Sequence, residues 1–113
     1  MRSVLRRWGD AFLDRVFTER ERIDPASPNA AAHFAVRFAA KEAFVKALGT
    51  GIAAGLTWKD VEVVSAANGA PGIALSGNAA RHSEERGAGA VHVSLSHGRA
   101  TAGAVVVIER RPQ

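Results

Sequence analysis

Apolar residues recur with a helical period in the first half of the chain. From Arg2 to Phe17 they are spaced by three and four positions, which predicts an amphipathic helix that Gly9-Asp10 is placed to interrupt. Thr18-Glu19-Arg20-Glu21 has the pattern of a capping box, so a short second helix is expected there. Ala30 to Leu48 predicts the longest helix, with Asn29 suited to cap its start and Gly49 to end it.

The period changes to two in the second half, which predicts strands. Val61 to Val64 and Ile73 to Leu75 flank Asn68-Gly69, a turn signal, so they should pair antiparallel. A short helix is expected over Asn78 to Arg86, and the last two predicted strands are Val91 to Ser96 and Ala102 to Glu109. The pattern therefore predicts an α+β fold in one domain, residues 1–113, with a small antiparallel sheet packed against one long helix and shorter helices.

Composition limits the chemistry and the partners. A chain of 113 residues with 47% hydrophobic positions has the size of one globular domain. It has no cysteine, so disulfides, thiolate catalysis and cysteine-bound zinc are excluded. No apolar run reaches the roughly 20 residues of a membrane span, and no signal-peptide h-region is visible, so we expect a cytoplasmic protein without membrane contact. The net charge of +4 favours an acidic partner.

Glu42 is the carboxylate in the long helix that needs an explanation. On a helical wheel it projects within about 60° of the centre of the apolar stripe. That stripe contains Phe34, Phe38, Val45 and Leu48. One interpretation is an ion pair with Lys46, one turn further on. The other is a ligand for a hard cation such as magnesium, with Lys41 and Lys46 beside it to meet phosphate oxygens.

Two other segments give weaker signals. Gly49-Thr50-Gly51 resembles a loop that approaches a phosphate, although a helix end alone explains one of its glycines. In the strand before His97, polar His92, Ser94 and Ser96 alternate with apolar residues, so one face should be core and the other polar. Adjacent Ser96 and His97 then point to opposite faces without a nucleophile elbow, which argues against a serine hydrolase. Without further information His97 is a turn residue bonded to solvent.

The segments together resemble one enzyme family. Arg37-Phe38-Ala39-Ala40-Lys41-Glu42-Ala43-Phe44-Val45-Lys46-Ala47-Leu48-Gly49-Thr50-Gly51 is very similar to the signature helix of holo-acyl-carrier-protein synthases. Asn68-Gly69-Ala70-Pro71 and Val91-His92-Val93-Ser94-Leu95-Ser96-His97 follow in family order, and the resemblance covers essentially the whole chain. It implies the 4'-phosphopantetheinyl transferase fold and the transfer of 4'-phosphopantetheine from coenzyme A to a serine of apo acyl carrier protein, in fatty acid or polyketide biosynthesis.

The resemblance also implies roles for individual residues. Glu42 would be a Mg²⁺ ligand, and Lys46 would also help to deprotonate the serine. The residues expected around coenzyme A are Arg37, Lys41, Lys46, Gly49, Thr50, Gly51, Pro71, Ser96 and His97; Pro71, Ser96 and His97 would line its adenine and ribose-phosphate end. Arg2, Arg6 and Arg7 of the first helix would dock the acidic carrier protein. A homotrimer with active sites shared between subunits is expected.

One departure from the family pattern leaves alternatives open. The family begins with a strand carrying a Gly-x-Asp motif whose aspartate is the other protein ligand of magnesium, and neither Asp10 nor Asp14 replaces it. We expect that translation of the natural protein starts upstream of Met1. The alternative is a non-catalytic relic that binds acyl carrier protein or coenzyme A without transfer. The interpretation of the chain as a nucleic-acid-binding domain is supported by its charge alone, and no nucleic acid partner is expected.

Overall fold

The computed structural model describes residues 2–52, 55–97 and 102–112, with side chains from Gly9 onward. Its helices are α1 (Arg2–Val16), α2 (Ala30–Leu48) and α3 (Gly77–Glu85), with single 3₁₀ turns at η1 (Glu19–Glu21) and η2 (Trp58–Asp60). Its strands are β1 (Val61–Ser65), β2 (Pro71–Leu75), β3 (Ala88–His97) and β4 (Ala102–Arg110). The predicted helices and strands are thus confirmed, most of them within one or two residues.

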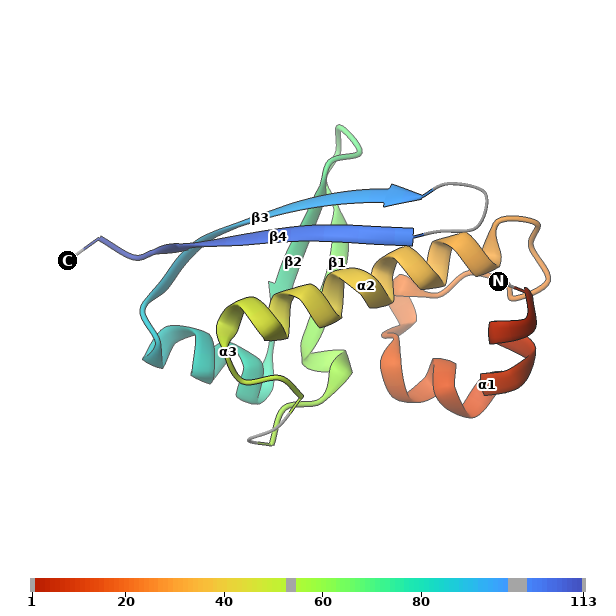
Figure 1. Cartoon of the computed structure of the whole chain (residues 1–113), viewed down its shortest axis with the longest axis horizontal. Helices are drawn as coiled ribbons and strands as arrows, with labels where there is room; N and C mark the ends of the chain where they lie inside the picture. The colour runs from red at the N-terminus through yellow and green to blue at the C-terminus, as the bar shows by residue number, and fades with distance from the viewer. Residues whose placement is uncertain (1, 53–54, 98–101, 113) are drawn as a thin grey trace.

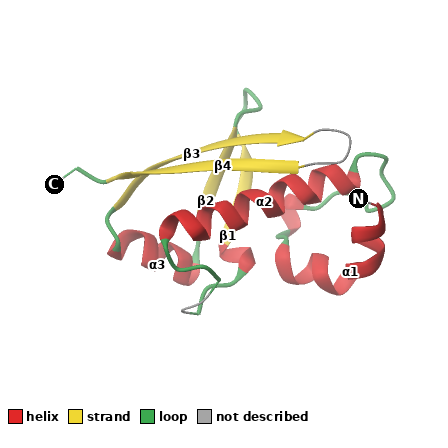
Figure 2. Cartoon of the chain, viewed as in Figure 1, coloured by secondary structure: helices red, strands yellow, loops and turns green. Residues whose placement is uncertain are grey.

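The strands form two separate two-stranded sheets, β1–β2 and β3–β4 (Figure 2). Both pairs are antiparallel, as predicted, with Val61 opposite Leu75 in the first and Val91 opposite Ile108 in the second. The predicted α+β fold with antiparallel strands is confirmed. Among the described residues the strands divide into two ladders, because β2 and β3 touch but do not share hydrogen bonds. In the first hairpin the Asn68 side chain accepts a hydrogen bond from the Ala70 N–H at 3.0 Å, which fixes the predicted turn.

Helix α2 lies along the β3–β4 ribbon, with α1 near its beginning and α3 near its end (Figure 1). It contributes to both apolar clusters of the molecule. Phe34 packs with Leu13, Val16 and Phe17 near α1. The other cluster contains Phe44, Val45, Leu48, Leu56, Val61 and Ala79, with Val91, Val106 and Ile108 of the ribbon packed against it. Because α2 is covered from several sides, its buried surface is wider than the single stripe predicted from sequence.

The predicted interruption of α1 is present, whereas the predicted cap of α2 differs in detail. Gly9 has φ 61° and ψ −166°, so α1 is kinked at the predicted interruption. Asn29 occupies the N-cap position of α2, but its side chain makes no capping hydrogen bond. Within the described residues, no helix combines the length and apolarity needed to cross a membrane.

The outer face of the β3–β4 ribbon is more apolar than the sequence of β3 suggested. On β3 the alternation is confirmed, because His92 and Ser94 are exposed. Opposite them on β4 are Val107 and Val105, which are 52% and 63% exposed. These two large apolar side chains therefore lie exposed on the same face of β4.

Candidate functional site

Lys41 lies inside the protein. Its side chain is 0% exposed, and its ammonium donates to Glu21 Oε1 at 2.7 Å and to the carbonyl oxygens of Val61 at 2.7 Å and Trp58 at 3.0 Å. All three donors of the ammonium are therefore used. The expectation that Lys41 faces the phosphates of coenzyme A is contradicted by this placement. A buried ammonium whose three donors are all used within the protein cannot bind a phosphate.

Glu21 makes the other half of this buried clamp. Its Oε1 also accepts the Thr18 N–H at 2.8 Å, as the capping-box pattern predicted, and its Oε2 accepts the Val63 N–H at 2.8 Å. Burial lowers the pKa of Lys41, and the hydrogen bond and charge of Glu21 oppose that shift. The clamp ties η1, α2 and β1 together and thereby fixes the rotation of α2 about its axis.

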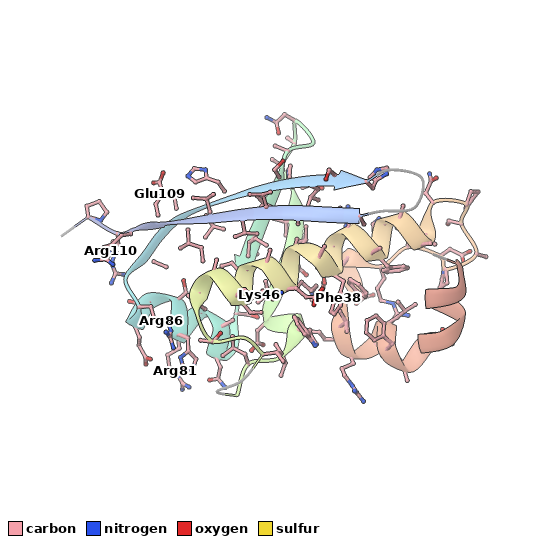
Figure 3. The ribbon with its side chains drawn as sticks, viewed as in Figure 1. Phe38, Lys46, Arg81, Arg86, Glu109 and Arg110 are labelled. Atoms are coloured by element: carbon pink, nitrogen blue, oxygen red, sulfur yellow. The ribbon has the colours of Figure 1, made fainter. Side chains whose placement is uncertain are left out.

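Glu42 and Lys46 lie on the open side of α2. Glu42 is half-buried and Lys46 is exposed, and Figure 3 shows Lys46 on the long helix. Among the described residues no ion pair joins them, so the structure does not support the simpler interpretation of Glu42. The buried side of α2 is centred near Lys41, so Glu42, the next residue, is turned about 100° away from it. The prediction that Glu42 projects near the centre of the apolar stripe is therefore corrected.

A lone carboxylate is a partial fit for magnesium. Its oxygens are the donors that Mg²⁺ prefers, and the ion is commonly held by one or two carboxylates together with substrate phosphates and water. Among the described residues there is no group of three or more acidic, histidine or cysteine side chains able to hold a metal. Glu42 thus fits the ion only if other ligands come from the substrate or from another chain segment.

The Gly49-Thr50-Gly51 loop ends α2. The N–H groups of Gly49 and Gly51 both lie 3.1 Å from the Val45 carbonyl oxygen, and that of Thr50 lies 3.2 Å from it. Gly49 has φ 91° and Gly51 has φ 58°, a left-handed conformation that glycine tolerates best. These N–H groups point toward the end of the helix. They therefore do not form a cradle that could bind a phosphate. A Cβ at Gly51 would meet open space within 4 Å, so the loop surface stays accessible.

Arg37 and His97 come together in a pocket between the first part of α2 and the end of β3. The hollow has a volume of about 290 Å³. It is lined by Asn29, Ala32, His33, Val36, Arg37 and His97. Arg37 donates from Nη1 to the His33 carbonyl oxygen at 3.2 Å, and burial lowers its pKa. The structure thus groups two of the residues expected around coenzyme A and adds His33 to them.

Ser96 and Pro71 do not share this pocket within one chain. Ser96 is opposite Gly103 on the outer face of the ribbon, whereas His97, the next residue, turns to the other face. Pro71 is the first residue of β2 and pairs with Ser65 in the other sheet. The side chains of Arg2, Arg6 and Arg7 lie outside the described residues.

The pocket and the Glu42–Lys46 surface lie on different sides of α2. At 100° per residue, Glu42 is rotated by about 140° and Lys46 by about 180° from Arg37. Because Arg37 and Lys46 lie on opposite sides of α2, a ligand of moderate size would have to wrap around the helix to contact both residues of one chain. The residues expected to form one site are therefore split within a single chain.

Several structurally important residues were missed by the sequence reasoning. Glu21 was recognised only as half of a capping box, and His33 and the outward valines of β4 were not singled out. Arg86 was also missed: its Nη1 lies 3.7 Å from the position of a Cβ on Gly49, near the end of α2 (Figure 3). A wheel centred on Phe34, Lys41 and Leu48 would have revealed Lys41 as buried. No pattern marks His33.

Comparisons with known proteins agree with this fold. The sequence model of the 4'-phosphopantetheinyl transferase superfamily matches residues 1–102. The holo-[acyl-carrier-protein] synthase of Syntrophus aciditrophicus is 46% identical over 111 residues, covering 96% of this chain and 86% of the relative. The crystal structure of the synthase from Neisseria meningitidis has a TM-score of 0.85 at 33% identity, covering 96% of this chain and 87% of the other. The crystal structure of the Helicobacter pylori synthase in complex with coenzyme A has a TM-score of 0.80 at 29% identity, covering 95% of this chain and 89% of the other.

The sequence match and the structural match each span nearly all of the chain, and they name the same kind of protein. The signature segment from Arg37 to Gly51 forms one helix and its terminating loop, so the motif is placed as an intact structural unit. This chain therefore belongs to the 4'-phosphopantetheinyl transferase superfamily, among the holo-acyl-carrier-protein synthases.

Proposed function

We propose that this enzyme transfers 4'-phosphopantetheine from coenzyme A to a serine of apo acyl carrier protein, with magnesium, in the cytoplasm and in fatty acid or polyketide biosynthesis. The observation that carries the proposal is the relationship to holo-acyl-carrier-protein synthases over nearly the whole chain. The placement of half-buried Glu42 and exposed Lys46 on the open side of α2 and the Arg37–His97 pocket support it.

The reaction is a displacement at phosphorus. The serine oxygen forms a bond to the phosphorus that carries pantetheine, the anhydride bond to the adjacent phosphate breaks, and adenosine 3',5'-bisphosphate leaves. Lys46, in its neutral form, accepts the serine proton directly or through water. Glu42 would hold Mg²⁺, which when bound supplies charge neutralisation to the phosphates. Arg37 and His97 bind the phosphate-bearing end of coenzyme A and orient it.

A site shared between subunits explains why these residues are split. Arg37 and His97 of one chain and Glu42 and Lys46 of a neighbouring chain would enclose one coenzyme A molecule between them. The exposed valines of β4 offer a surface for such an assembly. In the proposed homotrimer, this face of each ribbon would be buried against the others. Arg2, Arg6 and Arg7 are proposed to face the acidic carrier protein, so that docking would weaken as salt rises.

The experiment is to incubate the chain with coenzyme A, Mg²⁺ and apo acyl carrier protein and to measure the mass of the carrier protein. We expect the carrier to gain the mass of phosphopantetheine, and Glu42→Gln to abolish the gain. Glu85→Gln, an exposed carboxylate on α3, is the matched control and should leave the gain unchanged. No gain with several carrier proteins, while the chain is folded, would contradict the proposal.

The second candidate function is a relic that binds coenzyme A or carrier protein without transfer. It is favoured by the fact that Glu42 has no acidic, histidine or cysteine cluster around it among the described residues. The same assay separates the two functions when it includes a chain extended by the codons upstream of Met1. If neither chain modifies the carrier but both bind coenzyme A, the relic is the better description.

A further inference from the structure

The Arg37–His97 pocket is lined by basic and neutral side chains only. Arg37 and His33 come from α2 and His97 from β3, and no carboxylate is among the lining residues. The first turn of α2 also lines it, and the positive end of the helix dipole adds to the same potential. Such a pocket is suited to a phosphate, and the charge of His33 within it depends on its surroundings.

His33 is held so that one of its ring nitrogens alone decides its charge. Its Nε2 lies 2.6 Å from the backbone carbonyl oxygen of Glu21. A carbonyl oxygen only accepts hydrogen bonds, so Nε2 carries the hydrogen in both protonation states. The remaining nitrogen, Nδ1, is unprotonated in neutral His33 and gains a proton when the ring becomes charged, without loss of the bond to Glu21.

The groups around His33 keep it neutral when the pocket is empty. Burial is the main cause that lowers its pKa, and the nearby charge of Arg37 lowers it further. The Glu21 carbonyl and carboxylate act in the opposite direction, but the carboxylate is already bound to Lys41 and to the Thr18 and Val63 N–H groups. His97 faces the pocket from β3. An anion in the pocket would reverse the balance, because it attracts the proton that Arg37 disfavours.

We propose that His33 is a third phosphate-binding residue of this pocket, and that it takes up a proton from solvent when the phosphate-bearing end of coenzyme A binds. This inference rests on the proposed function, since it names a further residue of the same site. Its consequence is that coenzyme A and the product adenosine 3',5'-bisphosphate bind more weakly as the pH rises through the range in which bound His33 loses its proton.

The test compares the pH dependence of binding in the wild type and in His33→Gln. Glutamine can still donate to the Glu21 carbonyl but cannot be protonated. Dissociation constants for adenosine 3',5'-bisphosphate are measured by calorimetry between pH 6 and pH 8.5. We expect the wild-type affinity to fall several-fold more than that of the variant over this range. A rise of about one pKa unit on binding sets an upper limit of about tenfold. Titration of the ligand's own phosphates is common to both proteins and cancels.

His82→Gln is the matched control, because His82 lies on α3 and does not line the pocket. It should keep the wild-type pH dependence. A second measurement needs no variant: the ring resonance of His33 is followed by NMR against pH, with and without the nucleotide, and its pKa should rise on binding.

The outcomes distinguish a failure of the proposed function from a failure of the role proposed for His33. A wild type that binds no adenosine 3',5'-bisphosphate at any pH overturns the proposed function and this inference with it. If the wild type binds, but His33→Gln has the same pH dependence and the His33 resonance does not move, only the role of His33 is overturned. His33 is then a packing residue between η1 and α2.

Discussion

Lys41 and Lys46 belong to the same helix and to the same sequence motif, yet their surroundings differ completely. The Lys41 ammonium is fully buried and bonded, whereas Lys46 is exposed. A buried ion pair is costly to break, because removal of one partner leaves the other charge without compensation in a medium of low polarity. We therefore expect different defects when the two lysines are replaced: loss of stability for Lys41 and loss of catalysis for Lys46.

Lys41→Met should lower the free energy of unfolding by about 3–5 kcal/mol, because it leaves the buried Glu21 carboxylate without its cation. Denaturant unfolding followed by circular dichroism measures the change. Lys59→Met, on the exposed surface of η2, is the control and should stay within about 0.5 kcal/mol of the wild type. Equal effects of the two substitutions would mean that the clamp contributes nothing specific.

Lys46→Arg should retain coenzyme A binding but lose catalysis. Arginine keeps the positive charge but does not accept a proton, so kcat should fall by about 100-fold while KM changes little. Lys46→Ala should impair both constants. Steady-state kinetics with apo carrier protein give the answer, and a Lys46→Arg enzyme with near wild-type kcat would show that Lys46 acts through its charge alone.

At the scale of elements, the end of α2 is fixed by backbone conformation rather than by side-chain packing. Gly49 adopts φ 91°, and among the described residues a Cβ there would meet Arg86 Nη1 alone, at an ordinary contact distance of 3.7 Å. Gly49→Ala should therefore destabilise the protein by about 1 kcal/mol through the left-handed conformation itself.

Gly72→Ala, in β2, is the control for this prediction. Its Cβ would meet Val64 at 3.6 Å, and its φ lies outside the left-handed region, so the substitution should be neutral or slightly stabilising. Thermal unfolding of both variants measures the difference. A loss for Gly72→Ala as large as that for Gly49→Ala would mean that packing, not φ, sets the cost.

At the scale of the whole molecule, the exposed valines on the outer face of the ribbon and the divided site both support the proposed homotrimer. Val105→Asp combined with Val107→Asp places two charges on the face that we propose to be buried between subunits. The wild type should sediment as a trimer and the double variant as a monomer in analytical ultracentrifugation. Ala67→Asp, in the exposed β1–β2 turn, should remain trimeric. A wild type that is monomeric would remove the basis for a shared site.

Mixing two inactive variants tests the shared site directly. Arg37→Ala and Glu42→Ala chains should each be inactive alone. Unfolded together and refolded as mixed trimers, they should recover about a quarter of the wild-type activity, since a quarter of the interfaces combine an intact Arg37 with an intact Glu42 from different chains. No recovery, despite mixed trimers, would place both residues in a site within one chain.

Much of this protein follows from local patterns in its sequence. The helical period and glycine stop signal specify α2 from Ala30 to Leu48, and the turn at Asn68-Gly69 specifies the first hairpin, because backbone propensity and capping act over a few neighbouring residues. The family motif in α2 identified Arg37, Glu42 and Lys46 as candidate site residues, and the motif in β3 identified His97. Nothing non-local was needed for these conclusions.

The tertiary structure decided which of those side chains are available. Lys41 became a buried partner of Glu21 only because η1 and β1 pack against that side of α2. His33 joined Arg37 and His97 because β3 returns to the start of α2. Burial and long-range pairing depend on contacts between segments far apart in the chain, so a motif can name the chemical groups of a site, but only packing determines which of them face solvent and which hold the fold together.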